Sequence, residues 1–213
     1  MQTRGEYDAI HGETGMSTLA LNIRMQGKRA VIIGGGTVAL RKLHALLAAG
    51  ASVRIVAMDI CPDIAAMKDT GAFTVRIGSY NVADLENAFI VIAATDDDVV
   101  NEQISADAHE RAILVTNAGN TAEGDCTFPA VARRGNLEIA VSTGGICPTF
   151  AADVRDSIAE HIGHEYGTIL DTLAKEREKL LTNGSSSTYN VKVLRSLARR
   201  LLAEIAECKE LLP

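Results

Sequence analysis

The stretch VIIGGGTVALRKLHALLAAG, residues 31–50, constrains the fold more than any other part of the sequence. A short β-branched run at 29–33 predicts a buried strand that ends in three consecutive glycines. Apolar residues then recur every three or four positions up to Gly50, a natural helix stop, so residues 37–49 are predicted to be helical. A strand, a glycine turn and a helix in this order predict either a nucleotide-binding turn or a tight structural bend.

Strands and helices continue to alternate after this stretch. Apolar runs predict further strands at 52–57, 73–77, 89–94 and 112–116, and helices at 62–70 and 97–111. The connections between them are short. This alternation predicts an α/β fold of Rossmann type, with a doubly wound parallel sheet.

The pattern changes after residue 116. Residues 117–129 are polar and rich in turn residues, and one alternating strand is predicted at 137–143, after the turn signal RRGN. From Thr149 onward the sequence predicts helices, interrupted by a loop at 182–188. We therefore expect a flexible N-terminal extension (1–15), a dinucleotide-binding Rossmann domain (16–116), a central segment (117–148) and a C-terminal helical domain (149–213).

Composition and charge exclude several classes of function. The net charge of −6 argues against a general nucleic-acid or anionic-membrane binder. No run approaches the roughly 20 apolar residues of a membrane span, and the N-terminal residues lack the apolar core of a signal peptide. The cysteines show no spacing for zinc or for a redox dithiol, and isolated thiols indicate a reducing, cytoplasmic location. They are Cys61, Cys126, Cys147 and Cys208.

The glycine turn fits the G-x-G-x-x-G/A fingerprint of dinucleotide-binding proteins through Gly34, Gly36 and Ala39. Gly34 allows a sharp turn after the strand, Gly36 leaves room for a pyrophosphate, and Ala39 allows close packing of helix on strand. The first helical residues, Thr37 and Val38, offer backbone N–H groups and a positive dipole end to an anion. The turn is therefore predicted to bind a dinucleotide.

Polar residues follow two of the other predicted strands. Asp59 is the first acid after the second strand, where it can bind a ribose 2′-hydroxyl, which favours NAD over NADP, or cap the helix that Pro62 begins. Thr95 and Asp96 follow the strand at 89–94. Because the carboxyl ends of parallel strands face the ligand crevice, we predict a cofactor or substrate role for both, while one acid of the run 96–98 caps the next helix.

Three motifs in this order resemble one enzyme family. VIIGGGTVALRK (31–42), IAATDDDVVN (92–101) and AVSTGGICPT (140–149) are similar to the NAD-dependent precorrin-2 dehydrogenases, which include the dehydrogenase/ferrochelatase part of siroheme synthase. The resemblance runs from about Leu19 to at least Ile158. It implies that NAD takes a hydride from precorrin-2 to give sirohydrochlorin, in a homodimer built through the segment 117–148. Some members also insert ferrous iron.

The resemblance also implies site residues. The family's NAD contacts fall on Thr37, Val38, Met58 and Asp59, with Thr95 nearby. Ser142 and Thr143 match a phosphate-bearing or substrate-side serine pair of some relatives, although a hydrogen-bonding role at the strand end is the alternative. Arg155 keeps a basic position suited to the carboxylates of the tetrapyrrole, whereas Ala152 stands where another basic residue is expected.

One departure concerns the catalytic group. Family members carry an aspartate, thought to act in acid–base chemistry or chelation, in the loop after the fifth strand, and this position falls on Gly119 or Asn120 here. Asp125 is the nearest loop acid and is the predicted catalytic residue, with a surface turn residue as the alternative. The missing aspartate keeps a second function open, a non-catalytic NAD-binding sensor of the same fold. A chelatase without dehydrogenase activity is a third possibility.

No metal ligand set is identified by the sequence. His161 and His164 lie three apart on a predicted helix, a spacing that allows a shared metal ion. A solvated, charged helix face is the favoured interpretation of the pair.

Overall fold

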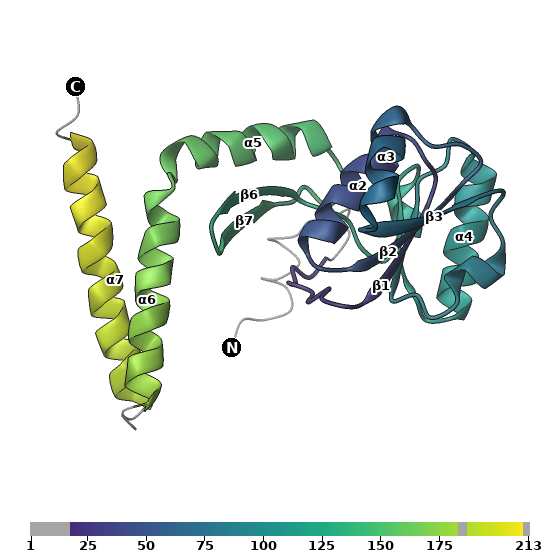
Figure 1. Ribbon diagram of the computed structural model, residues 1–213. Helices are drawn as coiled ribbons and strands as arrows, with labels where there is room; N and C mark the ends of the chain where they lie inside the picture. Colours follow the sequence, from purple (N-terminus) through teal and green to yellow (C-terminus); the bar gives the residue numbers. More distant parts are fainter. Residues whose placement is uncertain (1–17, 183–186, 211–213) are drawn as a thin grey trace, which may run out of the picture. The chain divides into compact units, whose positions relative to one another are not determined.

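The computed structural model describes residues 18–182 and 187–210, without the side chains of 187–189 and 207–210. The chain divides into two compact units, Met1–Thr127 and Phe128–Pro213, each of which has its own packing (Figure 1). The predicted extension at 1–15 and most of the predicted loop at 182–188 lie outside the described residues.

The first unit is built on a five-stranded parallel sheet. Its strands are β1 (Arg29–Ile33), β2 (Ser52–Ala57), β3 (Phe73–Ile77), β4 (Ile90–Ala93) and β5 (Leu114–Asn117). Their spatial order is β3-β2-β1-β4-β5, which reverses direction between β1 and β4. In such a sheet, ligands bind at the carboxyl ends of the strands, near the point of reversal. The predicted Rossmann-type α/β fold is confirmed.

Helices lie on both faces of this sheet (Figure 1). On one face, α2 (Thr37–Ala48) and α3 (Pro62–Met67, continued by the 3-10 turn η1, Lys68–Thr70) connect β1 to β2 and β2 to β3. On the other, Ile104 and Ala108 of α4 (Asp98–Glu110) join a fully apolar core with Val31, Val91 and other strand residues. The crossover from β3 to β4 contains only a four-residue 3-10 helix, η2 (Val82–Leu85).

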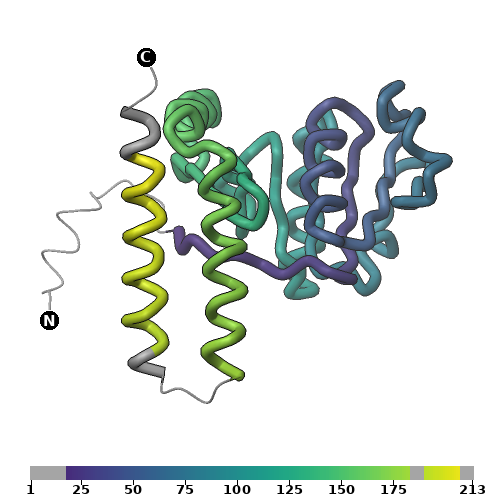
Figure 2. Tube along the Cα trace, turned by 60° about the vertical axis from the view of Figure 1, so that its left-hand side comes forward, coloured from purple at the N-terminus to yellow at the C-terminus, as the bar shows by residue number. Residues whose placement is uncertain are grey.

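The second unit begins with an antiparallel hairpin of β6 (Ala130–Arg134) and β7 (Leu137–Val141). Helix α5 (Pro148–His161) packs on the hairpin, and α6 (Glu165–Thr182) also contacts it. Helices α6 and α7 (Ser187–Glu210) lie side by side (Figure 2). Within the described residues, none of the helices is both long and apolar enough to cross a membrane.

The structure contains one strand that was not predicted and moves the boundaries of two predicted strands. Strand β6 was not expected, so Arg133 and Arg134 lie in a strand rather than on a turn, and the turn is at 135–136. Strand β5 begins at Leu114, because Ala112 adopts a positive φ of 54° that ends the preceding helical segment. Strand β7 ends at Val141, which leaves Ser142 in the loop that follows.

The observed units divide the chain after Thr127. The expected division into segments 117–148 and 149–213 describes functional parts rather than these packing units, and it stays a prediction.

Candidate functional site

The first glycine of the turn is required by close packing. Gly34 has φ of +126° and donates its N–H to the Val56 carbonyl at 2.8 Å. A Cβ at this position would come within 2.1 Å of the Ala94 carbonyl oxygen. The glycine turn is thus wedged between the carboxyl ends of β2 and β4, at the reversal point of the sheet.

The second glycine brings a further loop to the turn. A Cβ on Gly35 would meet the Asp59 carbonyl oxygen at 1.9 Å, and the Gly35 carbonyl accepts the Cys61 N–H at 2.8 Å. This contact was not predicted from the sequence. It places the loop that carries Met58 and Asp59 directly beside the glycine turn, and both side chains are exposed there.

The third glycine leaves an open space in front of a helix. Gly36 has an extended backbone (φ −86°, ψ −166°), and a Cβ there would meet no described atom within 4 Å beyond its chain neighbours. Among the described residues, no side chain caps α2, and its first residues Thr37 and Val38 are exposed. Ala39 is fully buried, as the fingerprint predicts. The free N–H groups and the positive end of the helix dipole therefore face a space that can take a phosphate.

Asp59 is not the cap of the next helix. The N-cap of α3 is Cys61, which makes no side-chain cap bond, whereas Asp59 Oδ1 accepts the N–H of Ile60 at 2.8 Å. Of the two roles that the sequence left open, the structure excludes capping and leaves an exposed carboxylate beside the glycine turn. Binding of a ribose hydroxyl by Asp59 stays a prediction.

The end of β4 is held by a buried amide that sequence reasoning missed. Asn101 on α4 is 1% exposed, and its Oδ1 accepts the Thr95 N–H at 3.1 Å and the Thr95 hydroxyl at 2.8 Å. Its Nδ2 donates to the Thr95 carbonyl at 3.0 Å. Asp97 caps α4 through the N–H groups of Val99 and Val100, as expected for one acid of the run, and Asp96 is exposed.

A second buried amide shapes the loop after β5. Asn117 is 2% exposed, and its Oδ1 accepts the N–H groups of Gly119 and Asn120, each at 3.0 Å. A Cβ on Gly119 would lie 2.8 Å from the Asp98 carboxylate. The loop position where relatives are expected to carry an aspartate thus faces an existing acid on α4.

Asp125 is tied to the sheet itself. Its Oδ2 accepts the Val115 N–H at 3.0 Å, and its Oδ1 lies 3.2 Å from Nε2 of His109. Val115 lies two residues before the end of β5, about 7 Å from the carboxyl edge along the strand. These contacts give the carboxylate a structural role, and a catalytic role stays a prediction.

The predicted substrate residues lie in the second unit. The Ser142 hydroxyl accepts the Gly144 N–H at 3.2 Å, and the Thr143 hydroxyl bonds both the N–H and the carbonyl of Cys147. Arg155 forms two hydrogen bonds to Asp156, at 2.8 and 2.7 Å, and this carboxylate raises the pKa of the guanidinium. Ser142 and Thr143 thus stabilise the loop before α5 through hydrogen bonds, which agrees with the alternative role predicted for them at the end of the strand.

Arg134 and the metal-ligand candidate His161 both contact carbonyl groups of the second unit. Arg134 donates to the carbonyls of Ile162 and Ala159, so it caps the carboxyl end of α5. His161 Nδ1 lies 2.8 Å from the Ser157 carbonyl. In the part of the chain that the structure describes, no three histidine, cysteine or acidic side chains converge on a metal site.

Comparison with known proteins identifies a nucleotide-binding family in the unit that contains the glycine turn. A family model described as "Putative NAD(P)-binding" matches residues 21–130, and one described as "Sirohaem biosynthesis protein central" matches residues 134–161. Siroheme synthase of Pseudomonas entomophila is 38% identical over 165 residues, 78% of this chain and 36% of that protein. Siroheme synthase of Actinobacillus succinogenes is 32% identical over 173 residues, 81% of this chain and 36% of that protein.

The solved structure titled "SirC, precorrin-2 dehydrogenase" matches with a TM-score of 0.71 and 23% identity, over 89% of this chain and 100% of that one. These matches confirm the resemblance predicted from the three sequence motifs. The chain spans about a third of the length of the siroheme synthases that it matches. Because the first family model covers more than half of the sequence, the chain belongs to the "Putative NAD(P)-binding" family.

Proposed function

We propose that this chain is an NAD-dependent dehydrogenase that oxidises precorrin-2 to sirohydrochlorin. The observation that carries the proposal is the glycine turn, with an uncapped helix behind it and the Asp59 carboxylate beside it, in a chain whose next segment matches the sirohaem central model. The residues present fit a dinucleotide, because the space in front of Gly36 is open and lined by unpaired N–H groups.

NAD, when bound, supplies the hydride acceptor for this oxidation, and one proton is released with each hydride transferred. The N–H groups of Thr37 and Val38 would hold the pyrophosphate oxygens, and Asp59 would accept a hydrogen bond from a ribose hydroxyl. The same carboxylate repels a 2′-phosphate, which favours NAD over NADP. Met58, which is exposed on the loop beside the glycine turn, would contact the same dinucleotide.

Thr95 and Asp96 are further proposed contacts at the carboxyl end of β4, where Asn101 fixes the backbone of Thr95. Ser142, Thr143 and Arg155 are the proposed substrate contacts, since the acidic side chains of the tetrapyrrole need hydrogen-bond donors and a cation. Asp125 as the acid–base group is supported only by its place in the loop after β5.

A homodimer and a cytoplasmic location are part of the proposal. The β6–β7 sheet has only two strands, so each strand presents an unpaired edge to which a second copy can add. Cys61, Cys126 and Cys147, the thiols that the structure describes, are all free, which fits a reducing compartment.

The test is turnover of precorrin-2 under anaerobic conditions, with NAD or NADP, followed by NADH absorbance and sirohydrochlorin formation. Gly36→Val places a side chain in the open space in front of the helix, and its extended backbone accepts valine without strain. Ala48→Val is the matched control, at the exposed far end of the same helix.

We expect turnover with NAD, a loss of at least about a hundredfold in kcat/KM for Gly36→Val, and no change for Ala48→Val. NAD binding without turnover would instead identify a sensor. Iron insertion into sirohydrochlorin without any dehydrogenation would identify a chelatase.

A further inference from the structure

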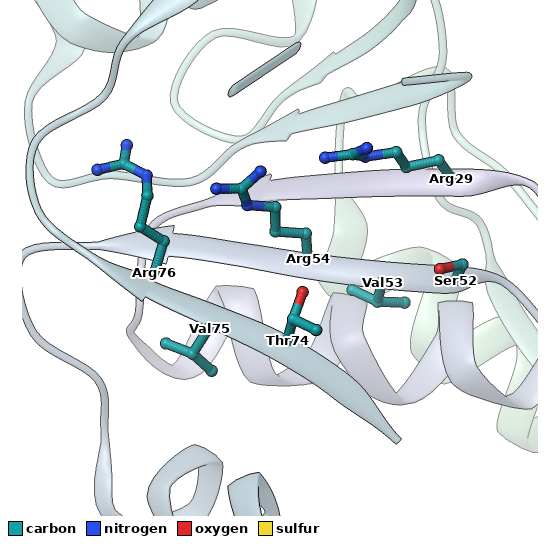
Figure 3. Close-up of a pocket in the computed structure, with 7 residues that line it drawn as sticks. All are labelled: Arg29, Ser52, Val53, Arg54, Thr74, Val75 and Arg76. Atoms are coloured by element: carbon teal, nitrogen blue, oxygen red, sulfur yellow. The ribbon is translucent and has the colours of Figure 1, made fainter. Parts of the chain in front are cut away.

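Three arginines align across neighbouring strands on the α4 side of the sheet. Register pairs Val31 of β1 with Arg54 of β2, and Arg54 with Thr74 of β3. Arg29 lies two residues before Val31, and Arg76 two residues after Thr74, so both point to the same face as Arg54. Figure 3 shows the three guanidinium groups on one side of the strands, with Val53 and Val75 on the other.

The local topology leaves this corner of the sheet open. Helices α2 and α3 lie on the opposite face, and the crossover from β3 to β4 contributes only the short η2. The result is a cavity of about 310 Å³, at the lower end of the size range of small-molecule sites. Besides the three arginines, the hydroxyl-bearing Ser52 and Thr74 line it.

The cavity carries an excess of positive charge. Asp84 of η2 is 4% exposed and is shared by two of the arginines: Arg76 donates two hydrogen bonds to it, and an Arg54 nitrogen lies 3.6 Å away. Among the described residues, the guanidinium of Arg29 has no hydrogen bond or ion pair. Three cations facing one carboxylate leave a net charge of +2, in a protein whose overall charge is −6.

We propose that this cavity binds a phosphate-type dianion, at a site distinct from the dinucleotide turn. A dianion balances the excess charge, and guanidinium forks match phosphate oxygens with paired hydrogen bonds. The hydroxyls of Ser52 and Thr74 supply further donors. Arg29 begins β1, about 16 Å along the strand from Gly34 of the glycine turn, so one phosphate cannot bind at both places.

The test is isothermal titration calorimetry with inorganic phosphate, without NAD, at constant ionic strength set by chloride. Arg29→Ala removes the unpaired cation, and Arg177→Ala removes an exposed arginine of α6 as the matched control. Gly36→Val blocks the other anion-binding position. We expect saturable binding to the unchanged protein, Arg177→Ala and Gly36→Val, and at least tenfold weaker binding to Arg29→Ala.

Binding that is lost in Gly36→Val and kept in Arg29→Ala would place the phosphate at the glycine turn and overturn the proposal. The absence of saturable binding to the unchanged protein would also overturn it. Neither result depends on precorrin-2 turnover. The phosphate site and the dehydrogenase activity are therefore tested by independent measurements. A circular dichroism melt of each variant without phosphate verifies that Arg29→Ala is folded.

Discussion

Replacing Asn101 by alanine tests whether the end of β4 depends on one side chain. The Asn101 carboxamide makes three hydrogen bonds, and all of them go to Thr95, at 3.1, 2.8 and 3.0 Å. Because Asn101 is 1% exposed, water does not reach the amide in the folded chain. The Asn101→Ala substitution removes all three bonds at once.

The expected loss follows from these contacts. Each bond contributes about 1 kcal/mol net, so the free energy of unfolding should fall by about 3 kcal/mol. For a chain of this length, the loss corresponds to a decrease in Tm of about 9 °C.

Urea unfolding followed by circular dichroism measures this loss. Gln103→Ala is the matched control, because it removes an amide from the same helix whose bond to Asp107 is exposed. We expect less than about 0.5 kcal/mol for Gln103→Ala. An Asn101→Ala protein within about 1 kcal/mol of the unchanged one would refute the reasoning, since Thr95 would then be held by other groups.

Three further substitutions test other parts of the first unit. Gly35→Ala should lower the free energy of unfolding by about 2 kcal/mol and weaken NAD binding, because its Cβ collides with the Asp59 carbonyl. Urea unfolding measures the stability and calorimetry measures the NAD affinity, and an unchanged affinity would contradict the expectation. Burial lowers the pKa of Lys42 from 10.5 to about 8, so the unfolded chain holds this proton to higher pH and native stability rises between those values. The stability of Lys42→Met relative to the unchanged protein should therefore fall by about 2 kcal/mol from pH 7 to pH 9.5 in urea titrations, and a constant difference would show that the amine is not desolvated. Asp125→Asn should lower kcat for precorrin-2 by about a hundredfold, because an amide cannot exchange a proton as the proposed acid–base group must, whereas a kcat within about threefold would leave the carboxylate its structural role alone.

The sheet could be predicted from the sequence because its strands are locally distinct. β1, β2 and β4 are nearly continuous apolar runs, as expected for strands buried on both faces. The amphipathic spacing of α2 likewise predicts which residues are buried, and Leu43 and Leu46 lie in the core.

Strand β6 could not be predicted, because its pattern is weak and its partner lies further along the chain. AVARR ends in two arginines, and only Ala132 within it is buried. The strand exists through its antiparallel pairing with β7, in which Ala132 lies opposite Ile139. Such pairing is a property of the folded chain rather than of a local window.

The residues of the glycine turn could be predicted because they form a sequence motif, whereas residues that join the turn through tertiary contacts were missed. Gly34 and Gly36 follow from the fingerprint, whereas the contact of Gly35 with the 58–61 loop depends on how two crossovers pack. The sequence contains one feature that could have identified Asn101 as a buried residue. It lies on the buried stripe of α4 with Ile104, Ser105 and Ala108, where a polar side chain requires a partner.

The contact between Gly35 and the 58–61 loop also limits how the sequence can change. Any residue other than glycine at position 35 needs the loop to retreat, because a Cβ would lie 1.9 Å from the Asp59 carbonyl oxygen. A shift of that loop would in turn break the Gly35–Cys61 backbone bond. Position 35 and the length of the 58–61 loop should therefore vary together among homologues. A homologue without glycine at this position should also differ in the length or sequence of that loop.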